Sequence, residues 1–126
     1  LMSALNEVGG LSVPAQKLLT FPSTLTTSLT TLYTAGSYRR PTIGSIHFTN
    51  KTGGALTFDL VYNDGTTDFY LAKDMALPAN SMVCIQANDD HFLAMEEGYS
   101  IKALASANTS VDCFLAIYES EGRRVT

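Results

Sequence analysis

The sequence predicts an all-β protein: an antiparallel β-sandwich of jelly-roll type with about eight strands and an extended N-terminal arm. Two observations support this. From Thr42 onward, apolar residues alternate with polar ones, which is the period of a half-buried strand, and no stretch there has the period of an amphipathic helix. Turn residues separate the alternating stretches about every ten residues, as they do in all-β sandwiches.

The three clearest strands are expected at residues 55–62, 99–105 and 110–118, where every second residue is apolar or aromatic. Shorter candidates lie at residues 29–34, 43–49, 68–72, 81–87 and 91–95. Asn63-Asp64-Gly65 is the strongest hairpin signal and predicts that the strands on either side of it pair. A second turn, at residues 51–54, is expected to pair the strands that it joins.

The 126 residues fit a single domain with extensions. We predict an N-terminal arm over residues 1–28, the sandwich over residues 29–119 and a short C-terminal tail over residues 120–126. The arm carries leucines and valines without a regular period, so we expect it to pack on a neighbouring subunit. It lacks the basic start and long apolar stretch of a secretory signal, and no run in the chain is long enough to span a bilayer.

The charge distribution argues against nucleic acid as a partner. The formal net charge is −4 for the whole chain. Residues 42–119 carry ten carboxylates against three lysines, so the sandwich itself is acidic. An acidic surface repels phosphate, and no basic stripe with interleaved aromatic residues offers an exception. We therefore expect neither a nucleic-acid nor a membrane partner.

No motif for catalysis, cofactor binding or metal binding stands out, so we expect a protein that is not an enzyme. The acidic stretch Asn88-Asp89-Asp90-His91 is interpreted as a solvated turn, although whether it binds an ion is left open. His47 is interpreted as a structural or surface histidine. Cys84 and Cys113 are predicted to be free thiols, with Cys113 facing the core and Cys84 facing away from it.

Apolar residues outside the expected core are the candidates for subunit contacts. Phe114, Ala116 and Tyr118 share the face of the last strand that lies opposite its core residues, and Leu104 is expected to point the same way. Such a face must be covered either by the chain's own residues 18–33 or by another subunit, and both remain open. The full set of interface candidates is Leu5, Val8, Leu11, Leu18, Leu19, Arg39, Arg40, Leu104, Phe114 and Tyr118.

Four stretches, in order, resemble a group of small bacteriophage virion proteins. They are Thr30–Gly36, Ile43–Asn50, Tyr70–Ala79 and Leu93–Ala103, so the resemblance spans about Thr30 to Glu119. It departs from the group at Ala35-Gly36-Ser37, where a proline and glycine turn is expected, and the segment before Thr20 has no counterpart. The resemblance implies a virion component without enzymatic activity.

The expected function is that of a head decoration (cement) protein that stabilises a capsid through subunit contacts. The expected partners are other copies of the chain, with a trimer favoured, and the major capsid protein or another virion protein. The protein is expected in the virion, after synthesis in the host bacterial cytoplasm. The alternatives are a neck, tail or fibre accessory protein, or a stand-alone carbohydrate-binding β-sandwich that would use Tyr38, Tyr70 and Tyr118.

Overall fold

A computed structural model describes residues 7–8, 11–12, 16–37, 39–86 and 93–121, and all regular structure in these ranges is β-strand. The strands are β1 (Glu7–Val8), β2 (Leu11–Ser12), β3 (Gln16–Thr24), β4 (Thr30–Thr34), β5 (Arg39–Asn50), β6 (Leu56–Asn63), β7 (Asp68–Leu77), β8 (Met82–Gln86), β9 (Leu93–Ala94), β10 (Ser100–Ala105) and β11 (Val111–Glu121).

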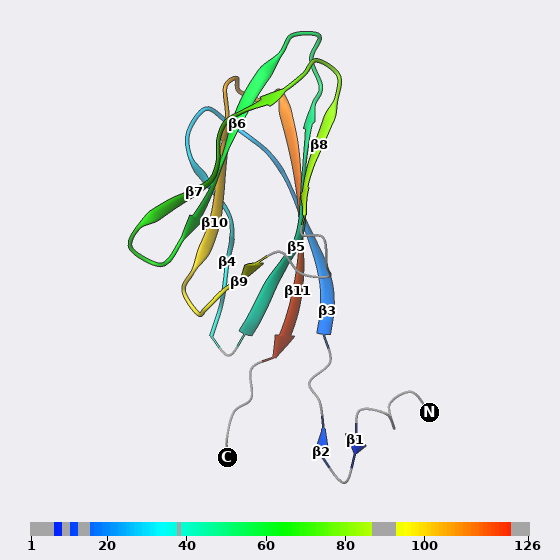
Figure 1. Cartoon of the computed structure of the whole chain (residues 1–126), viewed down its shortest axis with the longest axis vertical. Coiled ribbons are helices and arrows are strands. Elements are labelled where there is room, and N and C mark those ends of the chain that lie inside the picture. Colours follow the sequence, from blue (N-terminus) through cyan, green and yellow to red (C-terminus); the bar gives the residue numbers. More distant parts are fainter. Residues whose placement is uncertain (1–6, 9–10, 13–15, 38, 87–92, 122–126) are drawn as a thin grey trace.

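The strands form two antiparallel sheets that face each other (Figure 1). One sheet has the order β3-β11-β5-β8, with β9 also pairing with β5, and the other has the order β4-β10-β6-β7. The short strands β1 and β2 pair with each other and belong to neither sheet. The predicted all-β sandwich is therefore confirmed.

The strand pairs are nested along the chain, first with last. β3 pairs with β11, β4 with β10, β5 with β8, and β6 with β7. A long antiparallel hairpin that is folded over on itself gives this order, and it is the arrangement of the eight-stranded jelly roll. Because β3 and β11 are the first and last strands of the sandwich and are neighbours, they together form one side of the molecule.

The core lies between the sheets and is filled largely by alternate residues of the strands, although residues 58–61 of β6 are all buried. On β11 the buried residues are Val111, Cys113, Leu115 and Ile117, as the period-two pattern predicted. Phe48 of β5 and Phe58 of β6 stack across the two sheets with ring centroids 3.9 Å apart. The full core cluster adds Leu25, Tyr33, Ala35, Ile43, Ile46, Leu60, Ala72, Leu77, Met95, Ile101, Ala103 and Ala105.

Two predicted turns behave differently. The turn after Asn63 closes the β6–β7 hairpin as predicted, and the Asp64 carboxylate accepts the N–H groups of Thr66 and Thr67. Gly65 has a φ of 98°, a left-handed conformation that glycine adopts without steric cost. The turn at residues 51–54 does not pair its flanking strands, because β5 and β6 lie in opposite sheets. That prediction was wrong.

The N-terminal arm is shorter than predicted. Residues 16–24 form β3, which pairs with β11 over its whole length, and Leu25 is fully buried in the core. The boundary at residue 28 was therefore wrong, because residues 16–28 belong to the sandwich. At the other end β11 continues to Glu121, two residues beyond the predicted limit. Val8 and Leu11 face each other in the β1–β2 pair, which precedes the sandwich.

Candidate interaction surface

The outer face of the β3-β11-β5-β8 sheet carries the apolar residues that do not enter the core. On β11, Phe114 is 41% exposed, and Ala116 and Tyr118 are half-buried, while the residues between them are fully buried. This alternation follows from the pleat of the strand, which sends successive side chains to opposite faces. The prediction that Phe114, Ala116 and Tyr118 share the face opposite the core is confirmed.

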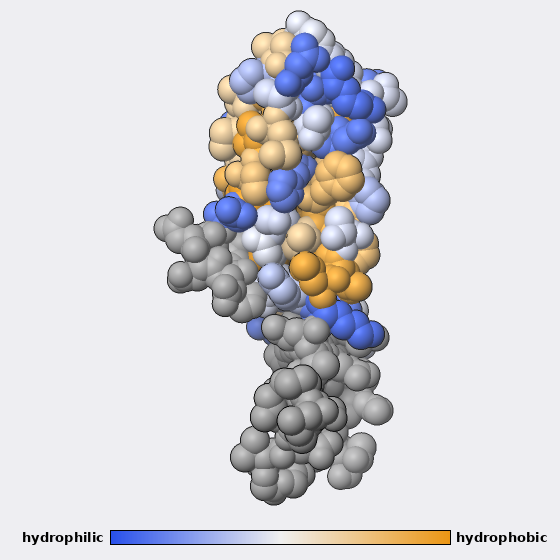
Figure 2. Space-filling model, turned by 90° about the vertical axis from the view of Figure 1, so that its right-hand side faces the viewer, coloured by the Kyte–Doolittle hydropathy of each residue, from blue (hydrophilic) through white to orange (hydrophobic). Residues whose placement is uncertain are grey.

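Strand β3 extends this face sideways. The register places Pro22 beside Phe114 and Leu18 beside Tyr118, and Leu18 is 58% exposed. The chain's own residues 18–24 therefore lie next to β11 in the same sheet and do not cover it. Leu18, Pro22, Phe114, Ala116 and Tyr118 together form what we call the β3–β11 surface. Figure 2, which views the molecule from this side, shows apolar side chains gathered in the lower half of its coloured part.

A glycine on the neighbouring strand shapes this surface. A Cβ atom on Gly44 of β5 would lie 3.0 Å from Cε2 of the Tyr118 ring, which is too close for an ordinary contact. Because Gly44 has no side chain, the Tyr118 ring lies against β5 and the β3–β11 surface does not protrude at this point.

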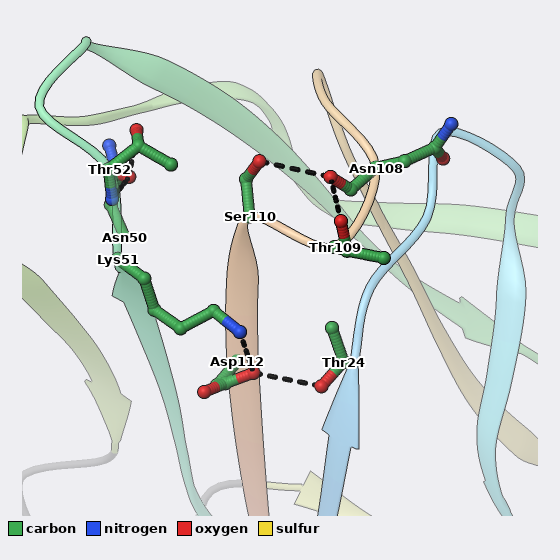
Figure 3. Close-up of polar contacts among 8 residues, drawn as sticks. All are labelled: Thr24, Asn50, Lys51, Thr52, Asn108, Thr109, Ser110 and Asp112. Carbon is green, nitrogen blue, oxygen red and sulfur yellow. Dashed lines mark hydrogen bonds and ion pairs between the residues drawn. The ribbon is translucent and has the colours of Figure 1, made fainter.

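A polar network borders the β3–β11 surface at one end of the sandwich (Figure 3). The Asp112 carboxylate accepts a hydrogen bond from Thr24 Oγ1 at 2.9 Å and forms an ion pair with Lys51 Nζ at 3.2 Å. Both contacts are largely exposed, so they define the edge of the apolar region more than they stabilise the fold. Beside this network lies an open hollow of about 420 Å³, lined by Pro22, Ser23, Thr24, Asp112 and Phe114.

The opposite part of the same outer face is more polar. The register places His47 of β5 between Phe114 and Cys84, and Cys84 of β8 is exposed. Met82 of β8 is also exposed, but Thr49 of β5 separates it from Asp112. The prediction for the two thiols is confirmed: both are free, Cys113 is in the core, and Cys84 points away from it. Burial raises the pKa of the Cys113 thiol to about 12.

Two groups of predicted interface residues lie elsewhere. Leu104 is on β10, in the other sheet, so it points away from the core on the opposite side of the sandwich from Phe114. The prediction that Leu104 shares a surface with Phe114 was wrong because β10 and β11 do not pair. In β5 the register places Arg39 opposite Glu121 and Arg40 opposite Ser120 of the same chain.

The N-terminal candidates are divided between two parts of the chain. Leu19 is half-buried on the inner side of β3, where it lies opposite Ile117 in the register. Val8 and Leu11 belong to the β1–β2 pair, and Leu5 lies outside the described residues. Among the members of this set whose side chains the structure describes, Leu18 contributes an exposed side chain to the β3–β11 surface and Leu19 does not.

A second exposed apolar group lies on β7, in the other sheet. Phe69 and Tyr70 are each 52% exposed, and Met75 is 40% exposed. Lys73 Nζ lies 5.4 Å from the centroid of the Tyr70 ring and forms an ion pair with the buried Asp59. The Tyr70 ring is therefore already in a cation–π contact with a lysine of its own chain.

The tyrosines that were considered as a carbohydrate platform are not brought together. Tyr70 is on β7 and Tyr118 is on β11, in different sheets, and Tyr38 lies outside the described residues. Sugar binding through stacked aromatic rings needs those rings on one face, so this trio does not form such a site.

The described residues were also compared with the requirements of a metal site and of a membrane-spanning helix. Among them, no group of three or more His, Cys, Asp or Glu side chains is placed to hold a metal ion. The acidic stretch Asp89-Asp90-His91 lies outside the described residues. No helix in the described part of the chain is long and apolar enough to cross a membrane.

Comparisons with known proteins show a likeness of fold. No protein-family model matches the sequence, and no curated protein matches it. A chain from Bacillus endospore appendages, described as disulfide-linked pili, is 12% identical with a TM-score of 0.54, over 86% of this chain and 88% of that one. A chain of the T13 viral particle of IBDV is 10% identical with a TM-score of 0.50, over 89% of this chain.

This chain spans 32% of the viral chain. At these identities the likeness to both neighbours concerns the fold alone. The resemblance to bacteriophage virion proteins in particular stays a prediction.

Sequence reasoning missed Pro22 as part of the surface, although a signal was present. A proline inside a strand is tolerated where its missing N–H would face away from the sheet, which marks an edge strand. Residues 1–28 were instead predicted to form an arm, because their leucines and valines follow no regular period. Met82, Phe69 and Met75 were also missed, because alternation alone does not tell which exposed apolar residues gather on one surface.

Proposed function

We propose that this protein is a structural subunit without enzymatic activity, which assembles through the β3–β11 surface. The observation that carries the proposal is the combination of Leu18 and Phe114, both exposed, with half-buried Tyr118 on one open face of a rigid sandwich. An exposed apolar face with a polar border has the composition of a protein–protein interface.

Within this class we favour a virion component, specifically a head decoration protein that stabilises a bacteriophage capsid. The resemblance of residues 30–119 to small phage virion proteins supports this choice, and the fold likeness to a viral particle chain is compatible with it. A homotrimer suits the three-fold axes of an icosahedral shell. The major capsid protein would be the second partner. A neck, tail or fibre position is the runner-up.

A pair of matched substitutions tests the assembly surface. Phe114 and Met75 are exposed to nearly the same extent, 41% and 40%, but lie on opposite sheets. Phe114→Asp places a charge in the β3–β11 surface and should weaken assembly, whereas Met75→Asp should leave it unchanged. The measurement is the mass of the purified protein in solution at micromolar concentration. A wild-type monomer, or equal effects of the two substitutions, would contradict the proposal.

The location in the particle needs a separate experiment. Antibodies against the folded domain should label the capsid of intact particles. Labelling that is confined to the tail would exclude the decoration role and leave the runner-up. Particles that carry no label at all would contradict a virion role.

A further inference from the structure

The free edge of β3 is the feature that carries a further inference. β3 ends its sheet, and its hydrogen-bonded neighbour among the described strands is β11 alone. It is nine residues long, and residues 18–24 carry no charge. Long edge strands without charges are templates for pairing with another chain, and proteins usually protect them with lysines, prolines or bulges.

The hydrogen bonds of the neighbouring residues show which groups of β3 face this edge. The N–H of Leu25 donates to Val111 O at 2.9 Å, so Leu25 points its backbone groups toward β11. The N–H of Lys51 donates to Ser110 O at 3.0 Å, so the even-numbered residues of β11 bond to β5 and the odd-numbered ones are left for β3. Because alternate residues of a strand point their backbone groups to opposite sides, Leu18 and Thr20 direct theirs to the free edge.

Pro22 agrees with this assignment and limits the edge. It has the same parity as Leu18 and Thr20, so its missing N–H costs no bond to β11. Toward the other end, continuation of the strand beyond Gln16 would reach Pro14, which also has no N–H to donate. Between these two prolines the free donors of the edge are Gln16, Leu18 and Thr20, a set that is symmetric about Leu18. Thr24, the other even-numbered residue of β3 with an N–H, lies beyond Pro22.

We propose that this edge pairs with the same edge of a second copy of the chain, antiparallel and about a two-fold axis at Leu18. In this register Leu18 faces Leu18 of the second copy, and Gln16 faces Thr20 in both directions. Every N–H of the window from Gln16 to Thr20 then has a carbonyl opposite it. Pro22 would face position 14, which is also proline, so neither proline takes the place of a donor within this window. A strand that adds to itself in this way makes an isologous contact.

The side chains support a second copy as the occupant. The Leu18 side chain lies on the outer face, so two-fold pairing brings the two leucines next to each other and joins the two β3–β11 surfaces into one. Lys17 is the one charged residue of β3, and it would face Leu19 of the second copy instead of another lysine. The contact therefore unites apolar surface without placing like charges opposite each other.

This inference rests on the proposed assembly function and adds a specific contact to it. The contact is pairwise, so a three-fold contact would have to be made elsewhere on the molecule. Two trimers linked through their β3 edges would form a particle of dihedral symmetry, and without a three-fold contact the product is a dimer. In both cases the number of chains in the assembled species is even.

The test removes one donor from the edge without disturbing the sheet. Thr20→Pro deletes an N–H that β11 does not use, so the sandwich should remain folded, as it does with Pro22. Pairing loses one hydrogen bond from each copy, at about 1 kcal/mol each. The dissociation constant should rise about 30-fold, which corresponds to about 2 kcal/mol. Thr20→Ala keeps the N–H and should leave the dissociation constant within about 2-fold of the wild-type value.

A charge pair tests the register directly. Leu18→Lys and Leu18→Glu should each prevent pairing, because each places two like charges opposite each other across the axis. A mixture of the two variants should restore pairing at a ratio of one to one, since Leu18 then faces a residue of opposite charge. Sedimentation of each variant and of the mixture gives the result, and circular dichroism verifies that each is folded.

The outcomes separate the inference from the proposed function. Two results together would support the inference. The wild-type protein forms a species with an even number of chains and Thr20→Pro halves that number, and the mixture of Leu18→Lys with Leu18→Glu reassembles. A wild-type trimer that Thr20→Pro leaves intact would overturn it and leave the proposed function standing. A wild-type monomer would count against both. If Thr20→Pro fails to fold, the Leu18 pair decides, and failure of the mixture to reassemble overturns the inference.

Discussion

Asn50 is a buried polar side chain that joins the two sheets at one end of the sandwich. It is 1% exposed at the end of β5, and its amide nitrogen lies within 2.8 Å of Gly54 O, 3.0 Å of Leu77 O and 3.2 Å of Pro78 O. Its amide oxygen accepts the N–H and the hydroxyl of Thr52. The side chain therefore links β5 in one sheet to the connection that leaves β7 in the other.

Substitution of Asn50 should cost a large part of the free energy of unfolding. The amide donates two hydrogen bonds, shared among three carbonyls, and accepts two, so Asn50→Ala removes about four bonds at about 1 kcal/mol each. We expect a loss of about 4 kcal/mol in urea denaturation. Asn50→Asp keeps the accepted bonds but places a carboxylate against three carbonyl oxygens, so at pH 7 it should destabilise the protein at least as much.

The pH dependence distinguishes the two variants. Burial and the facing carbonyls should raise the pKa of an aspartate at position 50 above its value in the unfolded chain. Stability is then fully present below the unfolded-state pKa and is lost as pH rises, so Asn50→Asp should recover partly near pH 4 and Asn50→Ala should not.

Asn108→Asp is the matched control for these variants. Asn108 is exposed, and its bonded atom is the oxygen that accepts the N–H of Thr27, which an aspartate retains. This substitution should change stability by less than about 0.5 kcal/mol. If Asn50→Asp were as stable as Asn108→Asp at pH 7, the reasoning would be refuted.

Two further predictions concern the thiols and the N-terminus. At pH 8 a thiol reagent should modify Cys84 in the folded protein and leave Cys113 unmodified, because burial raises the pKa of Cys113 to about 12. Both thiols should react in denaturant. Equal reaction rates of the two thiols in the folded protein would contradict the burial of Cys113. Since the unfolded thiol ionises first, the free energy of unfolding should also fall between about pH 9 and 12, less steeply in Cys113→Ala. Deletion of residues 1–15 removes no residue of either sandwich sheet, so the thermal midpoint of unfolding should not change. If the arm packs on a neighbour, the truncated chain should assemble more weakly. A truncated chain that assembles as well as the full one would show that the arm has no such role.

The elements of the fold could be predicted from the sequence because each is encoded locally. The period of two in residues 110–118 identified β11 and the direction of Phe114, and Asn63-Asp64-Gly65 identified a true hairpin. In each case the side chains that decide the structure lie within a few residues of one another. Alternation even assigned Cys84 and Cys113 to opposite faces of their strands.

The partners of the strands could not be predicted in the same way, because pairing is decided across the whole chain. Residues 51–54 have the composition of a hairpin turn. In the structure Asn50 donates a hydrogen bond to Gly54 O in this turn, and the chain passes there from one sheet to the other. Leu104 and Phe114 lie on consecutive strands, yet they face opposite sides of the sandwich. The sequence indicates where the turn lies, but it does not indicate which sheet the next strand joins.

The misassignment of residues 16–28 has a more specific cause. In a nested fold the first strand pairs with the last, so the partner of β3 is about a hundred residues away and no local pattern announces it. Pro22, which is unusual inside a strand, is a residue that an edge strand can carry because one side of its backbone is not used by the sheet. The same residue also restricts the open side of β3 to the short window around Leu18. A second copy of the chain can therefore be added along the free edge of β3 without disturbing the core.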